Sequence, residues 1–337
     1  MHSKISAISS FLPENRLSNE DLAALFEDWS PEKIFKKTGI RERAIAGANE
    51  TAGDLAGSAA ERLFAEYAIV PESIDFLIFC TQSPDYFLPT TACVIHRRLG
   101  LRSTSGAIDV NQGCSGFVYS LSLAKGLIAS GSARRVLILT ADTYSKYIHP
   151  RDKSVRTLFG DAGAAVLVDA VDTERPSRIG DFVFGTDGAG ACNLIVPTGG
   201  ARQSRSAASA IEVEDPSGNV RTGDNLYMNG SEIMSFTLGA VPAAIRQLSD
   251  LTGTPLDACD YVVMHQANAF MLEALRKKLA IPPERFPTRL EHCGNTVSST
   301  IPLVLEGLVR EQGGSGRLTA LVGFGVGYSW AACHVWL

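Results

Sequence analysis

The stretch that decides the fold is Gly106-Ala-Ile-Asp-Val-Asn-Gln-Gly-Cys-Ser-Gly-Phe117, in which a cysteine stands between a short apolar run and a helix-length segment. Residues 106–110 predict a strand, and the periodic residues 117–129 predict a helix. Backbone N–H groups at the start of a helix stabilise a thiolate. We therefore expect a lowered pKa for Cys114 and a nucleophile suited to thioester chemistry.

The other cysteines weigh against reading every thiol as reactive. The chain has seven cysteines, and a buried cysteine more often packs in a core than reacts. They include no Cys-x-x-Cys pair, so neither a disulfide framework nor a zinc site is predicted. A reduced, cytoplasmic setting without a metal fits this pattern best.

Length and composition set the class of protein. With 337 residues the chain is long enough for two core-forming halves, and its 45% hydrophobic and 20% charged residues are ordinary for a soluble globular protein. The formal net charge of −5 argues against a general nucleic-acid binder. No apolar run approaches the roughly 18 residues that a membrane-spanning helix needs, so we expect no membrane association.

Short apolar runs alternate with helix-length periodic segments, which favours an α/β fold with mostly parallel sheets. We expect an N-terminal half at residues 1–170, a connecting segment with a long polar loop at 171–225, and a C-terminal half at 226–337. The predicted strands are residues 4–9, 76–80, 106–110, 135–140, 164–169, 261–264, 318–322 and 331–336. The predicted helices are residues 52–66, 90–99, 117–129, 231–251, 269–279 and 299–311.

Two segments of the C-terminal half offer partners for Cys114. Tyr261-Val-Val-Met-His265 is an apolar strand that ends in histidine, and His292-Cys-Gly-Asn295 is a polar turn before a helix. Functional side chains collect at the carboxyl ends of strands in α/β sheets. Taken alone, His265 could be a structural histidine and Asn295 a turn residue. Their occurrence together with Cys114 indicates a catalytic set.

With these residues the sequence resembles β-ketoacyl-acyl-carrier-protein synthase III, the initiating condensing enzyme of fatty-acid synthesis in the thiolase superfamily. The resemblance covers essentially the whole chain. It implies the thiolase fold, with two related βαβαβ halves in a five-layered α-β-α-β-α arrangement, and a homodimer. Its markers are Thr38-Gly-Ile-Arg-Glu-Arg43, Gly113-Cys-Ser-Gly-Phe117, Phe159-Gly-Asp-Ala-Gly-Ala164, His265-Gln-Ala-Asn268, Gly294-Asn-Thr296 and Gly323-Phe-Gly-Val-Gly-Tyr-Ser-Trp330.

The resemblance implies a decarboxylative Claisen condensation. Cys114 would take an acyl group from acyl-CoA or an acyl-carrier protein, and the backbone N–H groups of Cys114 and Val326 would hold the oxyanion. Malonyl-carrier protein, or malonyl-CoA, would then lose CO2 while His265 and Asn295 donate hydrogen bonds to the enolate. No permanently bound cofactor is implied. Elongating synthases carry histidine where this chain has Asn295.

The acyl pocket implied by the resemblance is formed by Phe87, Leu88 and Phe159. Phe87 and Leu88 belong to a loop that in the family reaches across the dimer and closes the partner's pocket. A gate no larger than Leu88 would admit chains longer than acetyl, although Phe87 could fill that space. The length of the primer stays open.

The residues expected to bind a carrier protein or coenzyme A depart from the family's pattern. The family's adenine-clamping Trp and Arg are replaced by Lys33 and Lys153, and a basic docking residue by Phe270. Basic side chains would still steer an acidic acyl-carrier protein, so the donor could be either a coenzyme A or a carrier thioester. The residues expected to bind it are Lys33, Lys37, Lys153, Gly230, Asn268, Lys277 and Lys278.

Two other functions are compatible with parts of this pattern. On the same scaffold an acyltransferase could pass the acyl group from Cys114 to an alcohol or amine, with His265 as general base. The departures at Lys33, Lys153 and Phe270 leave room for this alternative. A non-catalytic partner subunit is the other, but such subunits lose the nucleophile that this chain retains.

Overall fold

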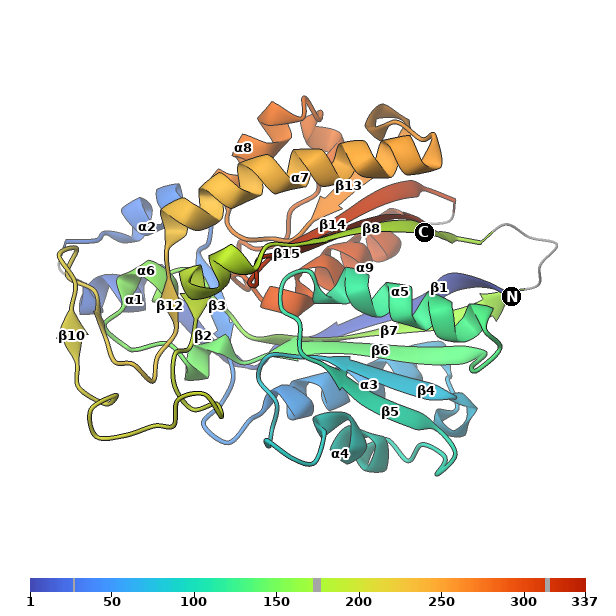
Figure 1. Ribbon diagram of the computed structural model, residues 1–337, viewed down its shortest axis with the longest axis horizontal. Helices are drawn as coiled ribbons and strands as arrows, with labels where there is room; N and C mark the ends of the chain where they lie inside the picture. The colour runs from blue at the N-terminus through green and yellow to red at the C-terminus, as the bar shows by residue number, and fades with distance from the viewer. Residues whose placement is uncertain (27, 172–176, 313–315) are drawn as a thin grey trace.

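Two sheets form the frame of the molecule (Figure 1). Its computed structural model describes residues 1–26, 28–171, 177–312 and 316–337. The first sheet has the order β1-β7-β6-β4-β5 and the second the order β13-β14-β15-β8. The strands of the first sheet are β1 (His2–Phe11), β4 (Phe76–Cys80), β5 (Gly106–Val110), β6 (Arg135–Asp142) and β7 (Ala162–Val171). Those of the second are β8 (Ile179–Thr186), β13 (Tyr261–Met264), β14 (Leu318–Gly325) and β15 (Ser329–Trp336).

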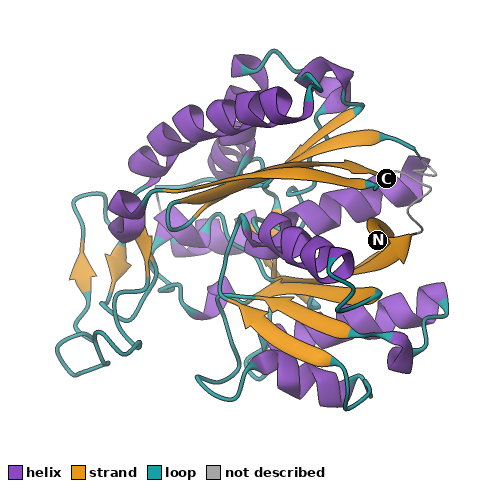
Figure 2. Ribbon diagram, turned by 45° about the vertical axis from the view of Figure 1, so that its right-hand side comes forward, coloured by secondary structure: helices purple, strands orange, loops and turns teal. Residues whose placement is uncertain are grey.

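Helices fill the space between the two sheets and cover their outer faces (Figure 2). Helices α5 (Gly116–Ala129) and α9 (Thr300–Gln312) lie between the sheets, and α3 (Ala52–Tyr67) and α4 (Thr91–Arg98) cover the first sheet. Helices α7 (Gly230–Thr252) and α8 (Ala269–Lys278) lie outside the second sheet. The predicted five-layered thiolase fold is thereby confirmed.

The central position of α5 follows from its composition. Phe117, Val118, Leu121 and Ile128 are buried around this helix and pack in one core with residues of both sheets. A helix that is apolar on nearly all sides is stable only when it is surrounded by protein. This helix therefore fixes the residue just before it, Cys114, between the two sheets.

The expectation of mostly parallel sheets is wrong, because the sheets are mixed. Strand β4 runs parallel to β5 and β6, and β13 runs parallel to β14. The pairs β1–β7, β6–β7, β14–β15 and β15–β8 are antiparallel. Only residues 326–328 separate β14 from β15, and a parallel pair needs a crossover of a dozen residues or more.

All predicted strands and helices are present, and several further elements accompany them. Strand β8 falls inside the segment that the sequence treats as a connection, yet it forms the edge of the second sheet. Gly180 and Gly185 interrupt its apolar pattern, and a side chain at Gly185 would collide with the ring of Trp330. The division at residues 170 and 225 stays a prediction.

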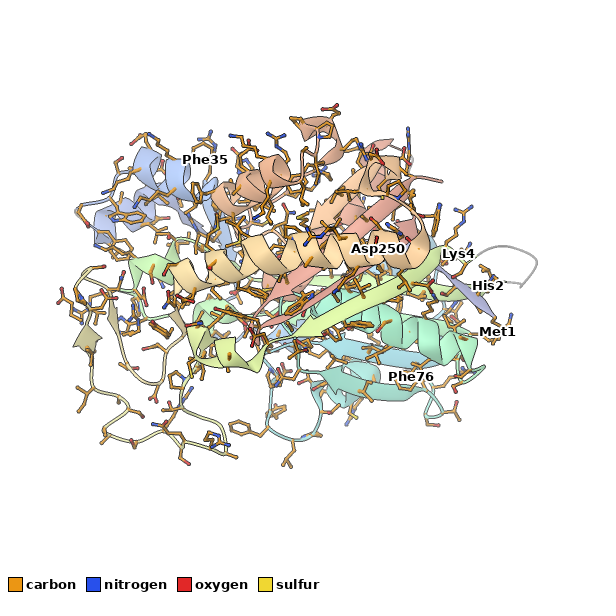
Figure 3. The ribbon with its side chains drawn as sticks, turned by 45° about the horizontal axis from the view of Figure 1, so that its top comes forward. Met1, His2, Lys4, Phe35, Phe76 and Asp250 are labelled. Atoms are coloured by element: carbon orange, nitrogen blue, oxygen red, sulfur yellow. The ribbon has the colours of Figure 1, made fainter. Side chains whose placement is uncertain are left out.

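The remaining elements lie mainly at the end of the molecule opposite the two chain termini (Figure 1). Figure 3 labels Phe35 at this end and Met1 at the other. The elements are β2 (Asn15–Ser18), α1 (Asn19–Leu25), α2 (Pro31–Thr38), β3 (Glu42–Ile45), α6 (Lys153–Arg156), β9 (Leu194–Ile195), β10 (Val213–Glu214), β11 (Val220–Arg221) and β12 (Tyr227–Met228).

Candidate active site

Cys114 occupies the turn between β5 and α5, and only 5% of it is exposed. Helix α5 begins two residues later, at Gly116. Strand β14 of the second sheet passes close to the sulfur at Gly325, where an added Cβ would lie 2.9 Å from Sγ of Cys114. A glycine at this position therefore leaves space beside the sulfur.

The three residues predicted to be catalytic line one cavity of about 70 Å³. Cys114 comes from the first half of the chain, and His265 and Asn295 come from the second. Both partners are almost completely buried. Three other predicted site residues line the same cavity, namely Phe159, Gly230 and Asn268.

His265 directly follows β13 and presents a neutral imidazole to this cavity. Its Nδ1 lies 2.8 Å from Oγ1 of Thr300, and its ring meets Phe324 edge-on at 5.5 Å between centroids. Burial lowers the pKa of His265 to about 3, although a hydrogen bond to the Val297 backbone opposes this effect. A neutral imidazole carries one N–H donor and one lone pair, so the histidine can donate a hydrogen bond without being charged.

The side-chain amide of Asn295 is held in place through its oxygen. Its Oδ1 accepts a hydrogen bond of 3.0 Å from the N–H of Val297. The backbone of Asn295 forms a bridge with Phe159, through hydrogen bonds to Leu158 (2.9 Å) and Gly160 (3.0 Å). Because the oxygen is already occupied, the amide N–H groups are the ones left to meet a ligand.

The electrostatics of Cys114 differ from the expectation. Burial, followed by the negative charge of Asp142, raises the pKa of the thiol to about 12. The backbone N–H groups of Val326 and Cys114 act in the opposite direction, which places both predicted oxyanion donors at the sulfur. The predicted lowering of the pKa is therefore wrong, because desolvation of a thiolate outweighs the nearby helix terminus.

Asp142, at the end of β6, is a buried carboxyl group that the sequence analysis missed. Its Oδ1 accepts a hydrogen bond from the N–H of Gln82 (2.8 Å), and its Oδ2 accepts two from Ser298, of 3.2 Å from N–H and 2.5 Å from Oγ. Burial raises its pKa to about 7. This carboxyl group ties the loop after β4 to the segment that follows Asn295.

The predicted acyl-pocket residues are separated in the single chain. Phe159 lines the catalytic cavity, whereas Phe87 and Leu88 are 91% and 82% exposed on the loop before α4. A second cavity of about 260 Å³ adjoins the first and shares Leu194 with it. Sequence reasoning missed this chamber, whose lining includes Gln82, Tyr144, Tyr147, Leu194, Leu226 and Val326.

The predicted lysines do not line the catalytic cavity. Lys33 donates to the backbone oxygen of Asp28 (2.7 Å), and Lys153 pairs with the carboxylate of the same residue (3.0 Å). Lys37 lies 4.5 Å from the ring centroid of Trp29.

Lys277 and Lys278 are the last two residues of α8, and Lys277 lies 3.3 Å from Glu273. Asn268 caps the same helix by accepting from Met271 N–H at 2.8 Å.

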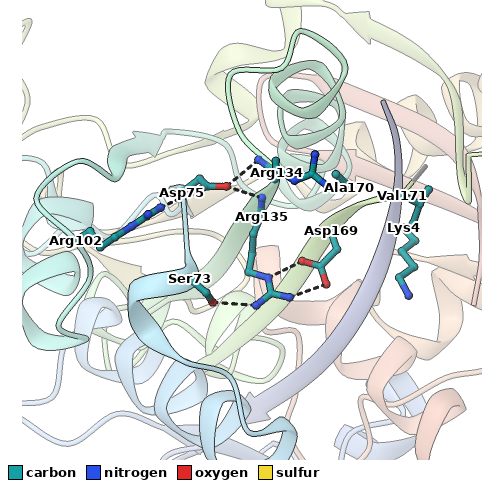
Figure 4. A pocket seen from close by; sticks show the side chains of 9 residues that line it. All are labelled: Lys4, Ser73, Asp75, Arg102, Arg134, Arg135, Asp169, Ala170 and Val171. Atoms are coloured by element: carbon teal, nitrogen blue, oxygen red, sulfur yellow. Dashed lines mark hydrogen bonds and ion pairs between the residues drawn. The ribbon is translucent and has the colours of Figure 1, made fainter. Parts of the chain in front are cut away.

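A larger surface depression is unrelated to this site. It measures about 670 Å³, lies at the far end of the first sheet and shares no residue with the catalytic cavity (Figure 4). Its arginines are largely engaged, since Arg135 pairs with Asp169 at 2.8 Å and Arg102 with Asp75 at 2.6 Å. Pocket size alone therefore does not mark the functional site.

In the described ranges no group of three His, Cys, Asp or Glu side chains is arranged to hold a metal ion. No helix in those ranges has the length and apolar character needed to cross a membrane. All seven cysteines are free thiols.

A thiolase fold with Cys, His and Asn around one cavity defines an acyl-transferring condensing enzyme. The chain belongs to the 3-oxoacyl-[acyl-carrier-protein (ACP)] synthase III family: its model matches residues 108–188, and the model of its C-terminal region matches residues 250–336. The protein is therefore an acyltransferase of this type.

Similar proteins cover the full length of the chain. A β-ketoacyl-[acyl-carrier-protein] synthase III from Halalkalibacterium halodurans is 38% identical and covers 97% of this chain and 94% of its own. A crystal structure of a 3-oxoacyl-(acyl-carrier-protein) synthase III matches with a TM-score of 0.98, 57% identity and complete coverage of both chains. The priming β-ketosynthase of the R1128 polyketide pathway gives 0.86 at 29% identity, covering 100% and 96%.

Proposed function

We propose that this protein condenses an acyl primer with malonyl-acyl-carrier protein, with loss of CO2, and that Cys114, His265 and Asn295 perform the chemistry. The observation that carries the assignment is the pairing of a neutral histidine with an asparagine whose amide oxygen is already occupied. Decarboxylation develops negative charge on the thioester oxygen, and such charge is stabilised by fixed hydrogen-bond donors. Two neutral donors beside a cysteine suit this reaction.

The first half-reaction is a transthioesterification on Cys114. The sulfur forms a bond to the acyl carbonyl carbon, the bond from this carbon to the carrier sulfur breaks, and the thiol proton passes to the departing sulfur. Because the thiol is fully protonated near neutral pH, the proton must leave as the new bond forms. The N–H groups of Cys114 and Val326 are proposed to hold the oxygen of the tetrahedral intermediate.

The second half-reaction uses the other two residues. Loss of CO2 from the malonyl group leaves an enolate, whose oxygen accepts hydrogen bonds from His265 and Asn295. The enolate carbon then attacks the acyl group on Cys114, the carbon–sulfur bond breaks, and the cysteine sulfur takes up a proton. An amide group cannot act as a base and take up a proton, so Asn295 serves only as a hydrogen-bond donor.

Intact-mass analysis of the wild type and Cys114→Ala tests this assignment. Both proteins are exposed to a panel of acyl thioesters and then to malonyl-acyl-carrier protein. The proposal requires an adduct on the wild type alone, discharged with CO2 as a β-ketoacyl product. An adduct that malonyl thioester leaves untouched but an alcohol or amine removes would instead identify an acyltransferase for a heteroatom acceptor.

We propose that an acidic acyl-carrier protein docks over α2 and the end of α8. These helices contact each other and carry Lys33, Lys37, Lys277 and Lys278. Lys33 and Lys153 are both engaged by Asp28, which argues against an adenine clamp at this place. Lys277→Glu should raise KM for the carrier substrate several-fold, whereas Lys4→Glu at the opposite end (Figure 3) should not.

A homodimer in the cytoplasm is also proposed. Strand β5 is an edge of the first sheet, and Ile108 on it is 38% exposed. The loop with Phe87 and Leu88 is exposed in the single chain, and pairing two copies along β5 would give these apolar side chains a partner. Seven free thiols fit a reducing compartment.

A further inference from the structure

Thr300 is a buried residue in direct contact with the ring of His265. It is the first residue of α9, and 2% of it is exposed. Its Oγ1 lies 2.8 Å from Nδ1 of His265 and 3.0 Å from the carbonyl oxygen of Val297. A hydroxyl group has a single proton, so it can donate to only one of these two acceptors at a time.

The choice of acceptor decides whether the ring proton of His265 is on Nδ1 or on Nε2. If Thr300 donates to Nδ1, the ring proton must reside on Nε2. If Thr300 donates to Val297, its oxygen accepts from Nδ1–H, and Nε2 then carries a lone pair. Only the first arrangement gives a neutral histidine an N–H to direct at an enolate oxygen.

Val297 is held in an unusual conformation that places both of its peptide groups at this site. Its φ angle is +54°, in the left-handed region that β-branched residues seldom adopt. The N–H of Val297 fixes the amide of Asn295, and its carbonyl group competes for the hydroxyl of Thr300. Strained backbone of this kind persists only where the surrounding structure enforces it, and it is concentrated at functional sites.

We propose that Thr300 is a positioning residue that donates its hydroxyl proton to Nδ1 of His265 and thereby holds the histidine in the Nε2–H form needed for decarboxylation. The proposal rests on the condensation reaction proposed above. It separates the two half-reactions, because the acylation of Cys114 relies on backbone donors and does not need this histidine proton.

Thr300→Val and Thr300→Ser form the matched test. Valine keeps the shape but removes the hydroxyl group. The hydrogen bond between His265 and the backbone of Val297, which the wild type also has, is then no longer opposed, so we expect the ring proton on Nδ1. CO2 release from malonyl thioester should then fall roughly 100-fold or more, as is typical for the loss of one oxyanion donor. The rate of Cys114 acylation should stay within about threefold, and Thr300→Ser should restore decarboxylation.

Nitrogen-15 NMR of histidine-labelled enzyme, with the His265 signal assigned through His265→Gln, reads the tautomer directly. The wild type and Thr300→Ser should carry the proton on Nε2, and Thr300→Val should carry it on Nδ1. A wild type protonated on Nδ1, or a Thr300→Val enzyme with unchanged decarboxylation, would overturn the inference. Equal losses of acylation and decarboxylation would also overturn it, because they indicate a purely structural role.

These outcomes are separable from a failure of the proposed function. If the acyl group on wild-type Cys114 is not discharged by malonyl thioester, condensation itself is refuted. The tautomer in the resting enzyme is measured without any substrate. A proton on Nε2 in that case would leave the contact between Thr300 and His265 as the determinant of the tautomer.

Discussion

At the scale of single residues, the proposed chemistry depends on a thiol that is buried beside a carboxyl group. Burial, followed by the negative charge of Asp142, makes the ionised form of Cys114 less favourable. The raised pKa keeps the thiol of Cys114 protonated near neutral pH. We propose that reactivity comes from the N–H groups of Cys114 and Val326, which stabilise negative charge only once it develops.

Asp142→Asn should lower the pKa of Cys114, because it removes a neighbouring negative charge. We expect the pH profile of Cys114 alkylation by iodoacetamide to move to lower pH. Asp161→Asn is the matched control, since Asp161 is a similarly buried carboxyl group that does not contribute to the raised pKa of Cys114. An unshifted profile for Asp142→Asn would show that burial alone sets this pKa.

Some of these residues could be recognised from sequence and others could not. His265 and Asn295 were predicted because each follows a distinctive pattern, an apolar strand in one case and a Gly-Asn turn in the other. Asp142 and Thr300 carry no comparable signal. An aspartate after an apolar strand or a threonine at a helix start looks like an ordinary capping residue, and their contacts come from segments distant in the chain.

At the scale of elements, the site is made where α5 and β14 meet. The approach of β14 is close enough that glycine is required at two positions. A Cβ at Gly323 would lie 2.7 Å from Cα of Ser115, and one at Gly325 would lie 2.8 Å from Cβ of Cys114. The Gly-rich segment in the sequence is therefore explained by packing against the nucleophile turn rather than by flexibility.

Gly325→Ala should reduce Cys114 acylation more than tenfold, because the added methyl group occupies space that the acyl group needs. Gly126→Ala is the control on the helix that follows Cys114. Apart from its chain neighbours and the backbone of its own helix, no atom lies within 4 Å of a Cβ added there. This variant should therefore acylate normally and gain about 0.5–1 kcal/mol of stability. Normal acylation of Gly325→Ala would show that the acyl group does not need the space beside Gly325.

The sheets themselves were only partly predictable from the sequence. Continuous apolar runs marked the buried strands, but strand direction depends on the connections between them. The turn after β14 is short, and glycines interrupt the apolar pattern of β8. The sequence therefore offers little from which to infer how these strands pair. The resemblance to a known family supplied the five-layered arrangement, which the apolar pattern alone did not.

At the scale of the whole molecule, two buried carboxyl groups make stability depend on pH. Burial raises the pKa of Asp142 to about 7 and that of Asp161 to about 6. A carboxyl group whose pKa is higher in the folded than in the unfolded state stabilises the fold when protonated. This contribution is lost as the pH rises from about 4 through the folded pKa.

The free energy of unfolding of the wild type, relative to that of Asp142→Asn, should therefore decrease between about pH 4 and pH 7. The expected change is on the order of 4 kcal/mol, from the difference between the two pKa values. Urea unfolding at a series of pH values measures it. Parallel curves for the two proteins over this range would show that Asp142 titrates normally in the folded state.

The proposed dimer makes a prediction at the same scale. Ile108→Lys places a charge on the exposed edge of the first sheet and should shift the protein toward a monomer in light scattering. Leu123→Lys, an exposed apolar position on α5, is a comparison for the loss of apolar surface alone. A wild type that is monomeric at micromolar concentration would refute the dimer.

The division of labour among the three residues is tested most directly by intact-mass measurement of Asn295→Ala after acyl-thioester loading and a malonyl-acyl-carrier-protein chase. The adduct on Cys114 should form at the wild-type rate. It should then persist in the chase, with CO2 release lowered roughly 100-fold or more. Failure of the adduct to form, or its discharge at the wild-type rate, would contradict the assignment of Asn295 as a donor for decarboxylation.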